Sequence, residues 1–177
     1  MSSRYILTGA PGAGKTALIR HLEVTGHDVV EEAATDVIAL AQAGGIERPW
    51  ENPGFIADIA ALQDWREAAP MRSERRFSDR SVFCTVALAE WLNHPAPTEL
   101  LATADRLAGS GWFARVVFFI DQLGFIENTS ARQISFEQAT QFAALHEVVY
   151  RRYGFEPRHI VPAPITDRAA VVLVAAS

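Results

Sequence analysis

Residues 9–16 read Gly9-Ala10-Pro11-Gly12-Ala13-Gly14-Lys15-Thr16 and match the phosphate-loop pattern GxxxxGK[ST] at every fixed position. Glycines allow the backbone to wrap closely around phosphate groups, so that successive N–H groups point inward. Lys15 is expected to reach the β- and γ-phosphates, and the Thr16 hydroxyl is expected to ligate Mg²⁺. The sequence therefore predicts a nucleoside triphosphate site formed by this loop and the following Ala17.

The segments around the loop alternate between strands and helices. A short buried strand at 5–7 precedes the loop, and a helix that begins at Gly14 or Lys15 follows it. Further strands are expected at 28–30, 75–78, 116–120 and 159–161, with helical patterns between them, including 55–66, 81–93, 98–108, 136–153 and 166–176. This order predicts an α/β, three-layer P-loop NTPase fold with a five-stranded parallel sheet and helices on both faces. We expect one nucleoside/nucleotide-kinase-like domain over residues 1–177, with a short lid.

Composition excludes several classes of function. The chain has 177 residues, a formal net charge of -5 and no dense run of basic residues. These features argue against binding to nucleic acid or to an anionic membrane through general electrostatics. Cys84 is the only cysteine, which excludes an intramolecular disulfide and a cysteine-based zinc site. No apolar run reaches the length of a membrane span, and the first strand leaves no room for a signal peptide, so a cytoplasmic location is expected.

Two aspartates compete for the metal that accompanies a bound triphosphate. Asp121 follows the very apolar run 116–120 and looks like a Walker B aspartate, whereas Asp79 ends the shorter strand at 75–78. Chain order favours Asp79, because in small P-loop kinases the third strand commonly lies beside the phosphate-loop strand and ends in an Asp-Arg or Glu-Arg pair. We therefore expect Thr16 and Asp79 to hold Mg²⁺.

Acidic and basic side chains at other strand ends are candidates for the acceptor side. Glu31 and Glu32 follow the strand at 28–30, and one of them is placed to accept or orient the proton of an attacking hydroxyl. Arg80 is expected to contact the acceptor, and Trp50 to stack on it or to join a hydrophobic cluster. A charge-rich stretch is expected to form a solvated helix face; it comprises Asp58, Asp64, Arg66, Arg72, Arg75 and Arg76.

A polar segment, 127–134, separates the apolar strand 116–120 from the helix at 136–153. An arginine there, Arg132, can close over the γ-phosphate and stabilise charge in the transition state; the alternative is an ordinary surface arginine near a helix whose N-cap is Ser135. The connection Pro162-Ala163-Pro164 is expected either to pack against the adenine ring or to cap the last helix.

Three further groups of residues resemble a known family. They are Val30-Glu31-Glu32-Ala33-Ala34, Phe77-Ser78-Asp79-Arg80-Ser81, and the C-terminal elements Ser135–Ala139, Tyr150–Phe155 and Asp167-Arg168. With the phosphate loop, they are similar to the AAA-type P-loop ATPase domain family, which includes the nicotinamide riboside kinase domain of the bacterial NAD regulator. The resemblance implies that Glu31 is the base, that Asp79 and Arg80 form the second catalytic element, and that Arg132 belongs to the lid.

The leading hypothesis is a small-molecule kinase that transfers the γ-phosphate of Mg-ATP to a hydroxyl of a nucleoside-like or similar metabolite. Its catalytic residues are expected to be Lys15, Glu31, Asp79, Arg80 and Arg132. ATP is the default nucleotide and GTP is possible, although no guanine-reading motif is present. The alternative is a nucleotide-dependent switch or regulatory protein with slow hydrolysis. Recognition of the acceptor is expected in residues 46–66, which match no motif.

Overall fold

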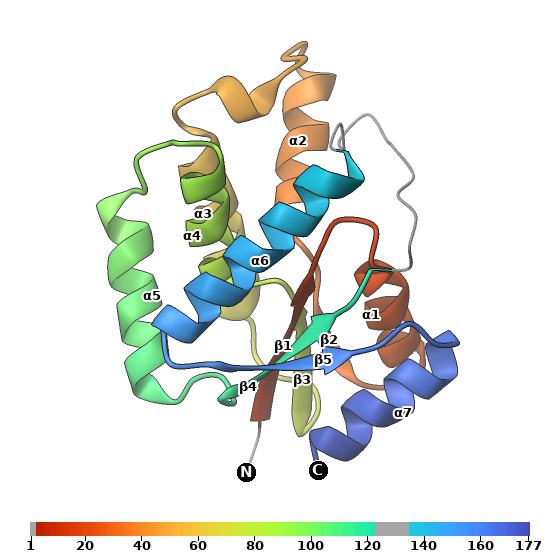
Figure 1. The fold of residues 1–177 in the computed structure, drawn as a ribbon. Coiled ribbons are helices and arrows are strands. Elements are labelled where there is room, and N and C mark those ends of the chain that lie inside the picture. Colours follow the sequence, from red (N-terminus) through yellow and green to blue (C-terminus); the bar gives the residue numbers. More distant parts are fainter. Residues whose placement is uncertain (1–2, 123–134) are drawn as a thin grey trace.

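The computed structural model describes residues 3–122 and 135–177. Within them, five parallel strands form one sheet in the order β2-β3-β1-β4-β5 (Figure 1). The strands are β1 (Ser3–Gly9), β2 (Asp28–Val30), β3 (Arg75–Asp79), β4 (Val116–Ile120) and β5 (Glu156–Ile160). This confirms the α/β class and the five-stranded parallel sheet. The last strand begins three residues before the predicted start at 159, at Glu156. Pro157 is tolerated there because β5 is an edge strand.

Helices cover both faces of the sheet. They are α1 (Lys15–Val24), α2 (Ala34–Ala43), α3 (Phe55–Glu67), α4 (Val82–Trp91), α5 (Thr98–Ser110), α6 (Phe136–Arg152) and α7 (Ile165–Ala175), and a short 3₁₀ turn lies at Pro49–Glu51. Among the described residues, no helix combines the length and the apolar character needed to cross a membrane.

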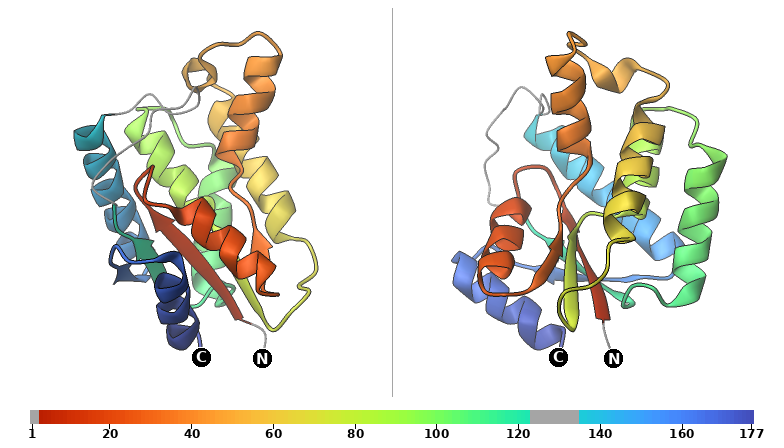
Figure 2. Two further views of the ribbon diagram at one scale, coloured as in Figure 1. Left: turned by 90° about the vertical axis from the view of Figure 1, so that its right-hand side faces the viewer. Right: turned by 180° about the vertical axis from the view of Figure 1, so that it is seen from behind.

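The core is divided into two layers by the alternation of side chains along the strands. Leu7 and Phe118 pack with α1 and α7 on one face, whereas Ile6 and Val117 pack with the helices of the other face, α3 to α6. Figure 2 shows α1 and α7 together on one side of the sheet and α3, α4 and α5 on the other. The sheet is thus buried on both faces, and its carboxyl edge is the place where chemistry-bearing side chains reach a crevice.

The sheet order places two connections side by side at that edge. Strand β3 pairs directly with β1, with Leu7 opposite Asp79, so the residue that ends β3 lies next to the start of the phosphate loop. Beyond the carboxyl edge stands α2, at the top of Figure 1, and no residue of this helix is fully buried. Residues of both α2 and α3 line the cavity described below.

Candidate active site

The phosphate loop joins β1 to α1 and depends on backbone conformations that only glycine adopts easily. Gly9 has φ 129°, and a Cβ atom at this position would lie 2.3 Å from the carbonyl oxygen of Ile120. Gly14 is the N-cap of α1 with φ 80°, and no side chain caps the helix. The first N–H groups of α1 are therefore left without a side-chain acceptor. Such groups, together with the helix dipole, form an anion site.

Lys15 is buried beneath this loop. Its ammonium group donates hydrogen bonds to the carbonyl oxygens of Gly9 at 3.1 Å and Ala10 at 2.8 Å. Burial, reinforced by the nearby Arg80 charge, lowers the pKa of Lys15 to about 8, so the group is still largely protonated at neutral pH. A cation held against the loop in this way is available to β- and γ-phosphate oxygens.

Asp79 reaches the loop from the neighbouring strand. Its Oδ2 accepts a hydrogen bond from the Thr16 hydroxyl at 3.3 Å, whereas its Oδ1 is buried and has no partner among the described residues. Burial, and next the Glu32 carboxylate, raise the pKa of Asp79 to about 6. An unpaired carboxylate oxygen beside a threonine hydroxyl fits Mg²⁺, which prefers oxygen ligands from one or two protein groups and from phosphates.

Asp121, the competing candidate, lies on the other side of β1 at the end of β4. Its Oδ1 is 2.7 Å from His159 Nδ1. Of the two aspartates, Asp79 is the one in contact with Thr16.

The two glutamates after β2 point in different directions, and the placement expected for Glu31 is corrected. Glu31 is about half exposed and forms an ion pair with Arg20 of α1 outside the cavity. Glu32 lines the cavity instead: its Oε1 accepts from Arg80 Nε at 2.6 Å, and its Oε2 accepts from the Thr35 hydroxyl at 2.9 Å. The acid that faces the phosphate loop is therefore Glu32.

Glu32 is held in its charged form. Burial alone would raise its pKa, but the positive charges of Arg80 and Lys15 outweigh burial and hold the pKa below its ordinary value. A carboxylate at neutral pH can accept a hydrogen bond from a hydroxyl and can orient it.

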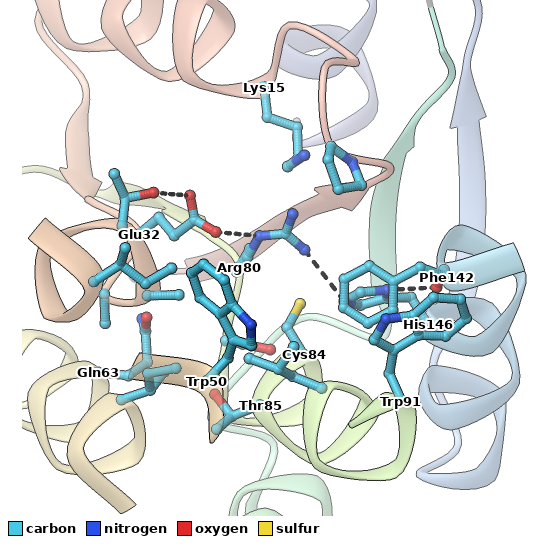
Figure 3. Close-up of a pocket in the computed structure, with 18 of the residues that line it drawn as sticks. Lys15, Glu32, Trp50, Gln63, Arg80, Cys84, Thr85, Trp91, Phe142 and His146 are labelled. Atoms are coloured by element: carbon cyan, nitrogen blue, oxygen red, sulfur yellow. Dashed lines mark hydrogen bonds and ion pairs between the residues drawn. The ribbon is translucent and has the colours of Figure 1, made fainter. Parts of the chain in front are cut away.

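Arg80 links this acid to α6. Its backbone is in the left-handed region, with φ 70°, and its N–H donates to the Leu7 carbonyl at 2.9 Å. This turn directs the guanidinium group to Glu32 and to Nε2 of His146, 3.2 Å away (Figure 3). His146 Nδ1 lies 2.8 Å from the Phe142 carbonyl, an acceptor, so Nδ1 carries the proton and Nε2 accepts from Arg80. Burial, and next the Arg80 charge, lower the pKa of His146 to about 3.

A cavity of about 480 Å³ extends from the phosphate loop past these groups. Its volume is in the range of small-molecule sites. Trp50, the residue considered for stacking, lines it, and so do residues that sequence reasoning did not single out: Gln63, Thr85, Trp91, Phe142 and His146 (Figure 3). Phe142 and His146 lie one helical turn apart on α6, a spacing that sequence alone attributes to a packed helix face.

Three other predictions have different outcomes. Arg132 lies outside the described residues. Arg168, near the predicted adenine connection, is buried and donates to the Ala13 carbonyl at 3.0 Å, so the start of α7 supports the loop; contact with adenine stays a prediction. Arg76 is buried rather than solvated, and its guanidinium group binds Asp28 Oδ2 at 2.8 Å.

The fold is shared with several solved kinases. Deoxyadenosine kinase from M. mycoides aligns with a TM-score of 0.64 and 10% identity, covering 98% of this chain and 97% of that chain. Shikimate kinase from Acinetobacter baumannii aligns with a TM-score of 0.57 and 14% identity, covering 99% and 93%. The NadR protein in complex with NAD and AMP-PNP gives a TM-score of 0.67 and 15% identity, covering 98% of this chain and 48% of NadR.

These identities are low and show the fold alone. No curated protein sequence matches the chain. The family, in contrast, is identified by sequence over most of the length, since residues 4–168 match the AAA domain. Together with the intact phosphate loop and the kinase-like sheet order, this match shows that the chain belongs to the AAA domain family of P-loop nucleotide-binding proteins.

Proposed function

We propose that this protein is an ATP-dependent kinase that transfers the γ-phosphate to a hydroxyl group of a nucleoside-like or similar small metabolite. One observation carries the proposal: the cavity of about 480 Å³ begins at Lys15 and Thr16 and has the Glu32 carboxylate in its wall. A protein that only binds a triphosphate needs the loop, but it has no need of a second, molecule-sized space beside the loop with an ionised acid in it. The likeness to solved kinases agrees with this reading.

Each residue then has a role in the reaction. The loop N–H groups and Lys15 bind the triphosphate, and Thr16 and Asp79 would hold Mg²⁺, which neutralises charge on the phosphate oxygens when it is bound. Glu32, in place of Glu31, accepts the hydrogen bond of the acceptor hydroxyl and takes its proton as the bond to phosphorus forms. Arg80 fixes the orientation of Glu32 through the bond to Oε1. Arg132 keeps its proposed role as the lid arginine.

Little covalent chemistry is required of the protein in such a reaction. Phosphoryl transfer depends mainly on positioning and on electrostatic stabilisation of the transferring group. For this reason a carboxylate with a low pKa, such as Glu32, is suitable. It need only hold the acceptor hydroxyl in line with the γ-phosphate until the hydroxyl proton becomes acidic, late in the reaction, as the bond to phosphorus forms.

The test is acceptor-dependent release of ADP. The protein is incubated with Mg-ATP and a panel of nucleosides and small alcohols, and ADP is measured against a reaction without acceptor. We expect at least one acceptor to raise the rate, and Lys15→Ala to abolish the increase. If no acceptor raises it while ATP or GTP still stabilises the fold, the kinase proposal fails and a nucleotide-dependent switch is the better description.

A further inference from the structure

The half of the cavity away from the phosphate loop contains no charged side chain among the described residues. The charged groups that line the cavity are Lys15, Glu32 and Arg80, and all three lie at the loop end. Arg80 is already paired with Glu32, and His146 is neutral because of its low pKa. An anionic or cationic group on the distal part of a ligand would therefore lose its hydration without gaining a partner there, which is costly.

The walls of this distal half are mostly apolar and aromatic. Trp50, Phe55, Trp91 and Phe142 line it, and Trp91 and Phe142 pack against each other with ring centroids 5.3 Å apart. Flat side chains of this kind favour a flat ligand, because faces and edges of rings can then make contact over their whole area.

Gln63 is a polar side chain in this lining, which also contains Thr85. It comes from α3, is 3% exposed, and its side chain rises from the helix toward the cavity in Figure 3. Its Nε2 is fully buried and has no hydrogen-bond partner among the described residues. Since Gln63 lines the cavity while Nε2 is covered, the carbonyl oxygen Oε1 is the atom of this amide that a ligand can reach.

A buried carboxyl group explains this orientation. Glu67 lies one turn further along α3 and is 5% exposed. Burial raises the pKa of Glu67, and Ser78, the charges of Arg76 and Arg4, and Gln63 oppose this shift; no hydrogen bond of normal length joins the Glu67 carboxyl group to Gln63. A carboxyl oxygen can accept a hydrogen bond in either protonation state, so the Gln63 NH₂ group is attracted to Glu67 and turned away from the cavity.

We propose that the distal half of the cavity selects an uncharged, planar acceptor whose far edge carries an N–H or O–H donor for Gln63 Oε1, with Glu67 as the residue that positions Gln63. Only the description of the ligand as a phosphoryl acceptor rests on the proposed function. The selectivity itself is a property of ligand binding and can be measured without turnover. A ligand without the donor leaves a buried carbonyl oxygen unpaired, which costs roughly tenfold in affinity.

Matched probes separate the two requirements. The ligands are 4-hydroxybenzyl alcohol, which has a donor at the far edge, 4-methoxybenzyl alcohol, which lacks it, and 4-(hydroxymethyl)benzoate, which is charged. Uridine and 3-methyluridine form a second pair, and all are titrated calorimetrically into the protein saturated with ADP. We expect the donor-bearing member of at least one pair to bind roughly tenfold more tightly than its methylated partner, and the benzoate to bind most weakly.

Two variants show whether Gln63 is the cause. Gln63→Leu is expected to reduce the ratio within each pair to about one, since the amide oxygen proposed to distinguish its members is then absent. Glu67→Gln allows the Gln63 amide to rotate, so the affinity ratio within each pair is expected to fall partway toward one. With an acceptor that is phosphorylated, the KM for that acceptor is expected to rise while kcat is retained. Gln141→Leu, at an exposed position of α6 that does not line the cavity, is the control and leaves the ratio unchanged. Thermal unfolding of each variant confirms that it is folded.

The outcomes distinguish this inference from the proposed function. Selective binding without acceptor-dependent ADP release supports the inference and overturns the kinase proposal. Three results overturn the inference: equal binding within both pairs, tighter binding of the benzoate than of the uncharged alcohols, or an unchanged affinity ratio in Gln63→Leu. If a probe is phosphorylated in the same experiments, the kinase proposal still stands. Absence of a preference in both pairs overturns the inference, whether or not any probe is phosphorylated.

Discussion

The two adjacent glutamates after β2 provide a test in which one residue is the control for the other. Glu32→Gln keeps the shape of the side chain, and its amide can still accept from Arg80 through Oε1, but the group can no longer take a proton. Loss of a general base typically lowers the rate by about 10² to 10⁴, which is roughly 3 to 5 kcal/mol of transition-state stabilisation. Weakening the charge-assisted bond from Arg80, 2.6 Å long, costs about 1 to 3 kcal/mol of folding stability.

Glu31→Gln changes the same type of residue one position earlier. Its ion pair with Arg20 is exposed on both sides, and such pairs add little to stability. We expect turnover and thermal stability to stay close to those of the parent protein.

The assay is acceptor-dependent ADP release at saturating Mg-ATP, with ATP affinity measured separately by calorimetry. Glu32→Gln is expected to lose kcat and to keep its affinity for ATP, because Glu32 is not part of the loop that binds phosphate. The reasoning is refuted if Glu31→Gln loses activity as severely as Glu32→Gln, or if Glu32→Gln retains full turnover.

Three further perturbations follow from the packing. Gly9→Ala places a methyl group 2.3 Å from the Ile120 carbonyl at φ 129°, so we expect a stability loss above the roughly 1 to 3 kcal/mol of backbone strain, measured by urea unfolding. Arg76→Met leaves Asp28 buried without its cation and is expected to cost about 3 to 5 kcal/mol, and the double change with Asp28→Asn is expected to recover part of it; no recovery would contradict a buried pair. Between pH 3, the approximate pKa of His146 in the folded protein, and pH 6.5, its ordinary pKa, His146 binds a proton only in the unfolded chain. It therefore lowers the free energy of unfolding by about 1.4 kcal/mol for each pH unit as the pH falls through that range. His146→Gln is expected to show a shallower dependence of unfolding on acid pH.

The phosphate loop and the sheet could be predicted because local sequence determines them. Glycine spacing specifies the loop, and the regular alternation of strands and helices specifies a parallel sheet. Chain order then suggested that the strand ending in Asp79 is the neighbour of β1, and its pairing with Leu7 places Asp79 beside Thr16. These features depend on connectivity and on residues close together in the chain.

The direction of the glutamates could not be predicted in the same way. Strand β2 has only three residues, and three further residues pass before α2 begins, so its alternation does not extend reliably to Glu31 and Glu32. The choice depends on tertiary partners, Arg20 for the first and Arg80 for the second, which lie elsewhere in the sequence.

The cavity lining was missed for a related reason. The apolar residues of α3 suggest an inner face that continues through Leu62 to Trp65 or Arg66, yet Trp65 is 74% exposed and Gln63 and Glu67 are buried. The buried residues continue the spacing of four from Phe55 and Ile59, a signal present in the sequence but hidden because two of its members are polar. A polar residue on an otherwise apolar helical face was the available clue to this part of the site.

The most direct test of phosphoryl transfer at this cavity is ³¹P NMR of the protein with Mg-ATP and the acceptor that best stimulates ADP release. The account predicts a new phosphate monoester signal that grows in step with ADP in the parent protein and is absent in Glu32→Gln. Release of the γ-phosphate as inorganic phosphate alone, with no monoester at any stage, would contradict it.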